Sequence, residues 1–339
     1  MNQAPTSTHQ PTAAATPGNF AASGATRSAI DVGPWIESAL EQALDDVIEG
    51  RRGGALATAA QQQIDEEFGA ATAPPALAAA MRHAVFPGGA RVRPRLCLAV
   101  GMACGMRPKG LLTAGAAAIE LLHCASLVHD DLPCFDNAPL RRGQLSVHAA
   151  YGERLAVLAG DALIVLAFDV IGRVIAESPL RAAQLLRTVS AAVGMPGGIV
   201  AGQAWECESD VELSAYQRAK TGSLFVAAAV AGAQAAGENP LLWQRFGERL
   251  GEAYQVADDL RDVAADANEL GKPVGRDVAL DRPSAARQYG FGGAVRHFQS
   301  LVAAAMAAIP PCPGAAMLRQ MVEVESLRLV PLEWQQRAA

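Results

Sequence analysis

Two clusters of carboxylates, each at the end of an apolar helical pattern, are the residues of this chain best suited to chemistry. The first cluster consists of Asp130, Asp131 and Asp136, and the second consists of Asp258, Asp259 and Asp262. Acids placed beside buried segments are expensive to desolvate unless they bind a cation or a donor. The pattern therefore predicts two binding sites for a hard cation.

Basic residues at loops and helix ends accompany both clusters. They are Arg91, Arg93, Arg141, Arg142, Lys220, Lys272, Arg276 and Arg282. The planar guanidinium group of arginine matches the geometry of phosphate oxygens and stays charged, which indicates phosphate binding. The alternative is that a basic residue only keeps the surface soluble, and we assign this role to Arg95 and Arg276. His123 precedes Asp130 by two helical turns on the same face, so we assign it a ligand-binding role rather than that of an ordinary core histidine. Together these residues predict divalent cations that bridge the protein and a phosphorylated ligand.

Asp258 and Asp262 are four residues apart and therefore share one face of a helix. Magnesium takes oxygen ligands and usually completes its shell with water and substrate phosphate. The alternative is a solvated helix face with a salt bridge to Arg261. One cluster alone would favour that alternative, but two clusters on apolar helices favour metal binding.

Composition indicates an all-α protein. The 339 residues are rich in helix formers, only 5% are aromatic, and no sustained alternating strand pattern occurs. The formal net charge of −6 argues against a nucleic-acid surface. The six cysteines lack metal-type spacing, which favours a reducing, cytoplasmic setting. The apolar run 155–176 contains charged residues and is expected to be a core helix, so no integral membrane segment is predicted.

The chain divides into a tail and one large domain. Residues 1–33 are rich in small and polar residues and are predicted to be a disordered tail without a signal peptide, although an organelle transit peptide is an alternative. Residues 34–339 are predicted to form a single all-α domain. Helical patterns are expected at 34–48, 55–68, 76–86, 92–102, 116–131, 153–177, 181–193 and 241–263.

These motifs, in this order, resemble the trans-isoprenyl diphosphate synthases, also called polyprenyl synthetases. The resemblance extends from about Ala76 to Ala286. GGARVRP at 88–94 is similar to the family's GGKRxRP, DDLPCFD at 130–136 to the first aspartate-rich motif, and LRRG at 140–143 to its LRRG. Gly202-Gln203, Lys220-Thr221-Gly222, the segment 255–262 and Gly271-Lys272-Pro273 also match. The amino-acid sequences of these motifs are most similar to those of geranylgeranyl diphosphate synthases of carotenoid and bacteriochlorophyll pathways.

The resemblance implies an isoprenoid synthase-type helical bundle around a deep central cavity, a homodimer, and a role for each motif residue. Three magnesium ions would hold the diphosphate of an allylic starter, with Asp130, Asp136 and Asp258 as main ligands and Asp131, Asp259 and Asp262 in support. The binding site for this diphosphate would be completed by Arg141, Gln203, Lys220, Thr221, Gln255, Lys272 and Arg282. Isopentenyl diphosphate would be held opposite by Arg93, His123 and Arg142. Ionisation of the starter would produce an allylic cation that the isopentenyl double bond attacks.

The chain departs from the family pattern at several positions. Ala90 replaces a lysine that contacts isopentenyl diphosphate, Glu206 replaces an aspartate, and Arg282 replaces a lysine. Ala138-Pro139 and Gln144-Leu145 also differ from the usual residues. None of these changes removes a principal metal ligand, so activity is expected.

Product length is expected to depend on the first acid helix below the metals. Ala125 and Ser126 are small there, which predicts geranylgeranyl diphosphate, made from dimethylallyl, geranyl or farnesyl diphosphate, as the main product. The alternatives are a farnesyl diphosphate synthase and a catalytically weak regulatory subunit, the latter supported by Ala90. A class I terpene cyclase is less favoured, because the second aspartate cluster, Arg93 and His123 argue against it.

Overall fold

A computed structural model describes residues 31–50, 73–86, 88–209, 212–264 and 284–337, and it is helical almost throughout these ranges. The longer helices are α1 (Gly33–Ile48), α3 (Pro75–Val85), α4 (Val92–Ala103), α5 (Leu111–Asp130), α7 (Glu153–Gly172), α8 (Pro179–Val193), α11 (Ser223–Ala236), α12 (Leu241–Ala264), α15 (Ala285–Ala307) and α16 (Ala315–Leu329). Short elements are α6 (Val147–Tyr151), η1 (Ile175–Glu177), α9 (Ile199–Ala204), η2 (Trp205–Cys207), α10 (Leu213–Gln217), η3 (Arg218–Gly222) and α17 (Leu332–Arg337). The predicted all-α fold is confirmed.

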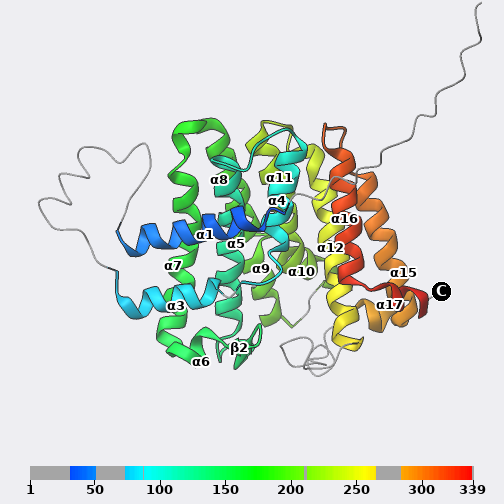
Figure 1. Cartoon of the computed structure of the whole chain (residues 1–339). Helices are drawn as coiled ribbons and strands as arrows, with labels where there is room; N and C mark the ends of the chain where they lie inside the picture. The colour runs from blue at the N-terminus through cyan, green and yellow to red at the C-terminus, as the bar shows by residue number, and fades with distance from the viewer. Residues whose placement is uncertain (1–30, 51–72, 87, 210–211, 265–283, 338–339) are drawn as a thin grey trace, which may run out of the picture. The chain divides into compact units, whose positions relative to one another are not determined.

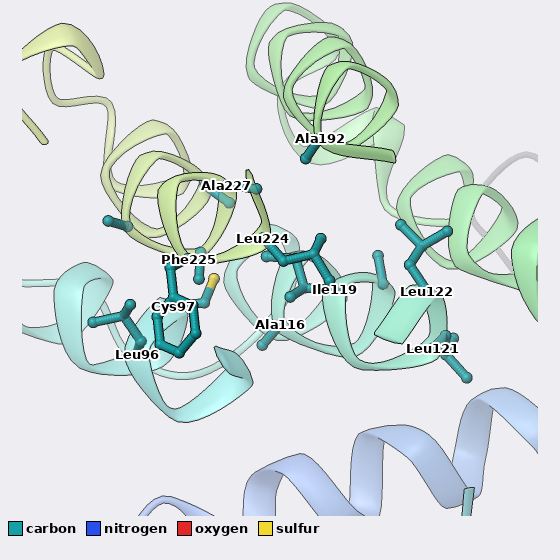
Figure 2. Packing of buried hydrophobic residues seen from close by; sticks show 14 of the residues in the cluster. Leu96, Cys97, Ala116, Ile119, Leu121, Leu122, Ala192, Leu224, Phe225 and Ala227 are labelled. Atoms are coloured by element: carbon teal, nitrogen blue, oxygen red, sulfur yellow. The ribbon is translucent and has the colours of Figure 1, made fainter. Parts of the chain in front are cut away.

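Helix α5, which carries the first acid cluster, lies within the core. It packs against α4, α7, α8 and α11, and 14 of its 20 residues are buried. Figure 2 shows Ala116 and Ile119 of this helix beside Leu224 and Ala227 of α11. A helix that is apolar on nearly every side must be surrounded by other helices, which is the arrangement seen in Figure 1.

Small residues let the central helices approach closely. A Cβ added to Gly232 of α11 would lie 2.4 Å from the carbonyl oxygen of Cys97 in α4. A Cβ added to Gly247 of α12 would lie 2.6 Å from the Cα of Val226 in α11. The backbones are thus in direct contact, and the N-termini of α4 and α11 come to the same end of the bundle as the C-termini of α5 and α12.

Helix α7 ends earlier than the predicted helix 153–177. The α-helix stops at Gly172, and a single 3-10 turn, η1, follows. This tighter turn carries Glu177, whose Oε2 accepts a hydrogen bond of 3.2 Å from the backbone N–H of Leu111. The turn therefore satisfies a free donor at the N-terminus of α5, which a continued α-helix would leave unpaired.

Two apolar helical stretches have the length and composition of a membrane span. In Leu111–Asp130 the most apolar window is 78% buried, as expected for a core helix. In Glu153–Glu177 only 44% of that window is buried. The outer face of α7 exposes Val157 by 42%, Leu158 by 51% and Val165 by 68%, so this helix is only half covered by the chain itself.

Several predictions lie outside the described residues. These are the tail up to residue 30, the helix at 55–68, and the two cations Lys272 and Arg282. The first described helix begins at Gly33, next to the predicted domain start at residue 34. The division of the chain into tail and domain stays a prediction.

Candidate active site

The loop after α5 folds back on the helix end and brings Asp136 beside Asp130. The backbone N–H of Asp136 donates to the carbonyl of Asp130 at 2.9 Å, and that of Ala138 donates to the carbonyl of Asp131 at 3.1 Å. Burial raises the pKa of Asp130 to about 6, Lys220 opposes the rise, and Asp136 adds to it. A carboxylate that is buried beside a second acid gains most from a bound cation, so Asp130 fits a magnesium ligand.

Asp131 points the other way and is committed to Arg141. It is only 2% exposed, and Arg141 Nε donates to its two oxygens at 3.0 and 3.2 Å while Nη2 also donates to it. Burial raises the pKa of Asp131, and the hydrogen bonds from Arg141 oppose that rise. This fork fixes the guanidinium of Arg141 next to the acid cluster. In this arrangement Asp131 orients Arg141; its predicted support of a metal stays a prediction.

A two-stranded hairpin positions Arg142. Strands β1 (Leu140–Arg141) and β2 (Gln144–Leu145) pair antiparallel, and Arg142 and Gly143 form the turn with φ of 53° and 77°. Positive φ at both positions is the geometry of a two-residue hairpin turn. The Arg142 side chain donates to the carbonyl of Gly88, and a Cβ added to Gly89 would lie 2.7 Å from its Cζ. The glycines of GGARVRP therefore leave the space in which Arg142 lies.

Arg93, His123 and Arg142 line one pocket of about 220 Å³, together with Arg141 and Asp258. Arg93 Nη1 lies 3.4 Å from His123 Nε2. Its guanidinium lies 4.8 Å from the centroid of the Phe225 ring and 5.7 Å from that of the Tyr254 ring. The rings hold the guanidinium by cation–π contact.

The electrostatics of this pocket favour an anion. Burial lowers the pKa of His123 well below its usual value, and the charges of Arg93 and Arg142 lower it further, so the ring is neutral. The buried Nε of Arg93 has no hydrogen-bond partner within the described residues. Three guanidinium groups around a neutral imidazole form a cradle with donors available for phosphate oxygens. Ala90 also lines the pocket, and it adds no charge.

Lys220 and Thr221 lie in η3, a single π-helical turn before α11. Lys220 Nζ lies 2.5 Å from Glu206 Oε1, which also accepts a hydrogen bond of 2.6 Å from the Tyr216 hydroxyl. Gln203 Nε2 donates to the other Glu206 oxygen at 3.4 Å. π-Turns inside helices occur often at functional sites. Here the turn places the ammonium group close enough to oppose the rise in the pKa of Asp130.

A chain of hydrogen bonds links Thr221 to the start of α15. The Thr221 hydroxyl donates to Gln255 Oε1 at 2.7 Å, and Gln255 Nε2 donates to Asp259 Oδ1 at 2.9 Å. Asp259 Oδ2 accepts from the backbone N–H of Ala285 at 2.7 Å. Asp259 is 3% exposed, so both of its oxygens are used inside the protein. Its predicted support of a metal stays a prediction, and its observed contacts are structural.

Asp258 and Asp262 lie on the more open side of α12. The Asp258 side chain is 40% exposed, lies 3.9 Å from Arg261, and lines the pocket with Arg93. Asp262 is partly exposed one turn further on. Within the described residues, no three acidic, histidine or cysteine side chains already surround a common point. A diphosphate whose oxygens complete the shells of magnesium ions would join the two clusters.

Arg91 differs from the other arginines that were assigned to phosphate. It is 5% exposed, and it pairs with Glu37 and Glu120 at 2.8 Å each. Its Nη2 also donates to the carbonyl of Val85. Its guanidinium is therefore used inside the fold, although Arg91 also borders the pocket that Arg93 lines, and its predicted role in phosphate binding stays a prediction. Sequence reasoning also missed the contact of Glu206 and Tyr216 with Lys220, because no spacing rule links residues on three different short elements.

A second cavity, larger than the pocket around Arg93, lies beside α12, and the role of Ala125 and Ser126 in product length stays a prediction. This cavity of about 870 Å³ is walled by residues of α8, α10, η3, α11, α12 and α15, including Ala192, Ala227, Val230 and Gln255. Neither Ala125 nor Ser126 is among the described residues that line it. Ala125 is 1% exposed in the packed core, and the Ser126 hydroxyl donates to the carbonyl of His123.

Comparisons with known proteins agree with this geometry. Residues 74–297 match the family model described as polyprenyl synthetase. A geranylgeranyl diphosphate synthase of Cereibacter sphaeroides is 51% identical over 280 residues, which cover 80% of this chain and 97% of the relative. One of Rhodobacter capsulatus is 51% identical over 76% of this chain and 90% of the relative. The structure of a Helicobacter pylori geranyltransferase, complexed with magnesium and isoprenyl diphosphate, superposes with a TM-score of 0.68 at 28% identity, covering 87% and 98% of the two chains.

Proposed function

The chain belongs to the polyprenyl synthetase family and is a prenyltransferase, and we propose that it condenses isopentenyl diphosphate with allylic diphosphates to make geranylgeranyl diphosphate. One observation carries this proposal. The cradle of Arg93, His123 and Arg142 shares a pocket with Asp258, next to the end of α5 where Asp130 and Asp136 meet. Two adjacent sites for diphosphate, of which one is acidic, are what the joining of two diphosphate substrates requires.

Each of the two sites binds the diphosphate of a different substrate. Asp130, Asp136 and Asp258 would hold magnesium, for which we propose three ions, with Asp262 close by. Bound magnesium neutralises the allylic diphosphate so that it can leave. Arg141, held by Asp131, and Lys220, held by Glu206, add positive charge on the same side. Gln203 and the hydrogen-bonded pair Thr221–Gln255 are proposed to contact the diphosphate on this side, and Lys272 and Arg282 are proposed to complete it from outside the described residues.

The second substrate is held by cations that are already in place. Arg93 and Arg142 bind the diphosphate of isopentenyl diphosphate, and neutral His123 hydrogen-bonds to it. Because Arg93 is fixed over Phe225 and Tyr254, its orientation costs little entropy on binding. The isopentenyl double bond then faces the allylic carbon, and aliphatic walls exclude water from the developing positive charge.

The proposed product length is supported by relatives of this chain, and the small side chains of Ala125 and Ser126 remain its predicted determinant. Two relatives that are 51% identical are named geranylgeranyl diphosphate synthases, which supports a twenty-carbon product over the fifteen-carbon alternative. The cavity of about 870 Å³ supplies room for a long chain next to Gln255. A weak regulatory subunit stays an alternative, because Ala90 leaves the cradle without one lysine.

We also propose that the chain is a homodimer in the cytoplasm. The outer face of α7 exposes Val157, Leu158 and Val165 around the charged Asp161, and exposed apolar side chains grouped on one helix in this way mark an interaction site. A second copy that covers this face through a symmetric contact is the simplest occupant.

A turnover assay tests the activity. The protein, magnesium and labelled isopentenyl diphosphate are incubated with dimethylallyl, geranyl or farnesyl diphosphate, and the products are sized by chromatography. We expect a twenty-carbon product. A fifteen-carbon product rejects the chain length but keeps the reaction, whereas folded protein that gives no product with any starter points to the regulatory subunit, and Ala90→Lys is then the first variant to test.

A matched pair of arginine variants tests the cradle. Arg93→Gln is expected to raise the KM for isopentenyl diphosphate at least tenfold while leaving the KM for the allylic substrate within about twofold. Arg95→Gln is the control, because Arg95 is exposed and its nearest described acid is Asp31 at 3.3 Å. Equal effects of the two variants would contradict the assignment of Arg93.

A further inference from the structure

Two cysteines far apart in the sequence meet at the end of α4. Cys104 caps the C-terminus of this helix, and Cys312 lies in the connection between α15 and α16. The backbone N–H of Gly314 donates to the carbonyl of Ala103 at 2.8 Å. A Cβ added to Gly314 would lie 2.5 Å from the Cα of Ala103. The connection therefore rests directly on the backbone beside Cys104.

The two thiols lie close enough together to influence each other's pKa, and both are free cysteines of intermediate burial. A small reagent can therefore reach this pair. Cys97 and Cys124 differ, because they are buried in the core, whereas Cys134 is exposed on the loop after α5 and Cys207 is exposed at the end of η2.

The surroundings make Cys312 the more reactive of the two. Burial, with smaller contributions from Cys312 and Glu238, raises the pKa of Cys104 to about 12. Burial also raises the pKa of Cys312, but the N–H of Gly314 and the charge of Arg319 counteract that rise. Since the thiolate is the attacking form, Cys312 reacts first.

We propose that Cys104 and Cys312 are a site of reversible oxidation that forms an intramolecular disulfide by exchange with a small-molecule disulfide. The Cys312 thiolate attacks one sulfur of the reagent and releases one thiolate, which takes up a proton. The Cys104 sulfur then attacks Cys312, gives up its own proton, and displaces the second thiolate. The protein loses two electrons and two protons, and the reagent is reduced to two thiols.

The bond would join α4 to the C-terminal helices at a distance from the substrate pocket. Arg93 lies in the first turn of α4 and Cys104 follows its last, which is roughly 18 Å along a helix of this length. The bond closes a loop of about 200 residues, and a loop of this size restricts the unfolded chain strongly. Oxidation is therefore expected to raise the Tm by about 5–10 °C and to change kcat by less than about twofold.

Full-length protein treated with oxidised glutathione or with dithiothreitol tests the proposal. Without reduction, the oxidised sample is expected to lose two hydrogens in intact mass and to yield a peptide pair joined through Cys104 and Cys312. A double variant, C134S/C207S, removes the exposed thiols and is expected to form the same bond. Cys312→Ser is expected to abolish both the joined peptides and the rise in Tm.

Two outcomes overturn the proposal. One is glutathione attached only to Cys134 or Cys207, with the other thiols still reduced. The other is a joined pair in which Cys104 is bonded to a cysteine other than Cys312. Neither outcome bears on the prenyltransferase activity, which is measured separately on reduced protein.

Discussion

Truncation of the adjacent acids Asp258 and Asp259 of α12 is expected to affect two different properties, turnover and folding stability. Asp259 is 3% exposed and accepts hydrogen bonds from Gln255 Nε2 and from the N–H of Ala285. Asp258 has a side chain that is 40% exposed, with Arg261 at 3.9 Å. We therefore predict that Asp259→Ala mainly destabilises the fold, whereas Asp258→Ala mainly abolishes turnover.

The size of the Asp259 effect follows from the donors it leaves behind. Each buried donor without an acceptor costs about 1–3 kcal/mol, so the two together lower the free energy of unfolding by about 2–6 kcal/mol. For a chain of this length that corresponds to a fall in Tm of roughly 3–8 °C. Asp259→Asn keeps the volume and one acceptor oxygen, so about half of this loss is expected. Asp258→Ala removes only an exposed ion pair worth less than about 1 kcal/mol.

The assay combines melting curves and kinetics on the same samples. The Tm is measured in buffer with a metal chelator and without substrate, so that only the protein's own contacts contribute. Turnover is then measured with magnesium and saturating substrates. We expect Asp258→Ala to melt within about 2 °C of wild type and to lose at least about a hundredfold in kcat. An Asp259→Ala variant that melts like wild type, but loses turnover as Asp258→Ala does, would refute the reasoning and support Asp259 as a metal ligand.

Four further outcomes are expected. Gly89→Ala places a Cβ 2.7 Å from the Arg142 guanidinium carbon, so the KM for isopentenyl diphosphate is expected to rise several-fold in steady-state kinetics while the Tm barely changes, because that side chain is flexible. The pKa of His123 is depressed in the folded state, so the unfolded state binds one more proton at low pH, and the free energy of unfolding falls as the pH drops below about 6.5. His123→Gln is expected to show a smaller difference in the free energy of unfolding between pH 7.5 and 5.5, measured by urea titration. Glu206→Gln removes the negative charge that pairs with Lys220, so the KM for the allylic substrate is expected to change in steady-state kinetics while the Tm changes little. Ala125→Tyr is expected to shorten the product at a cost of about 1–3 kcal/mol from overpacking, and an unchanged product spectrum from folded protein would remove Ala125 from the determinants of length.

The sequence was sufficient for the helices and for the identity of the family. Helical periodicity is a local property, so α1, α3, α4, α8 and α12 lie close to their predicted bounds, whereas α5 begins five residues earlier than predicted. The motif order was equally informative, because the spacing of aspartates, arginines and glycines along the chain is fixed before folding. Where the prediction ran too long, at the end of α7, a contact with the start of α5 ends the helix.

The roles of neighbouring charged residues required the tertiary structure. The sequence grouped Asp258 with Asp259 and Arg91 with Arg93, because each pair shares a motif. Asp258 and Asp259 are successive positions on α12 and point about 100° apart, so Asp258 lines the pocket while Asp259 hydrogen-bonds to Ala285. Arg91 and Arg93 both border the pocket, but the guanidinium of Arg91 is buried and paired inside the fold. Whether a charge is open to a ligand depends on which distant segment covers it, as Glu37 and Glu120 cover Arg91.

Cavity shape likewise depends on packing between helices rather than on one helix. Ala125 is small, but its neighbours close around it, and the open volume next to Gln255 arises where α8, α11, α12 and α15 leave space. The pairing of Cys104 with Cys312 has the same origin, since a glycine lets a distant connection rest on the end of α4. The sequence thus determined which residue types were present and which helices carried them, and the tertiary structure decided which side chains meet, because side-chain environment is set by contacts between distant segments.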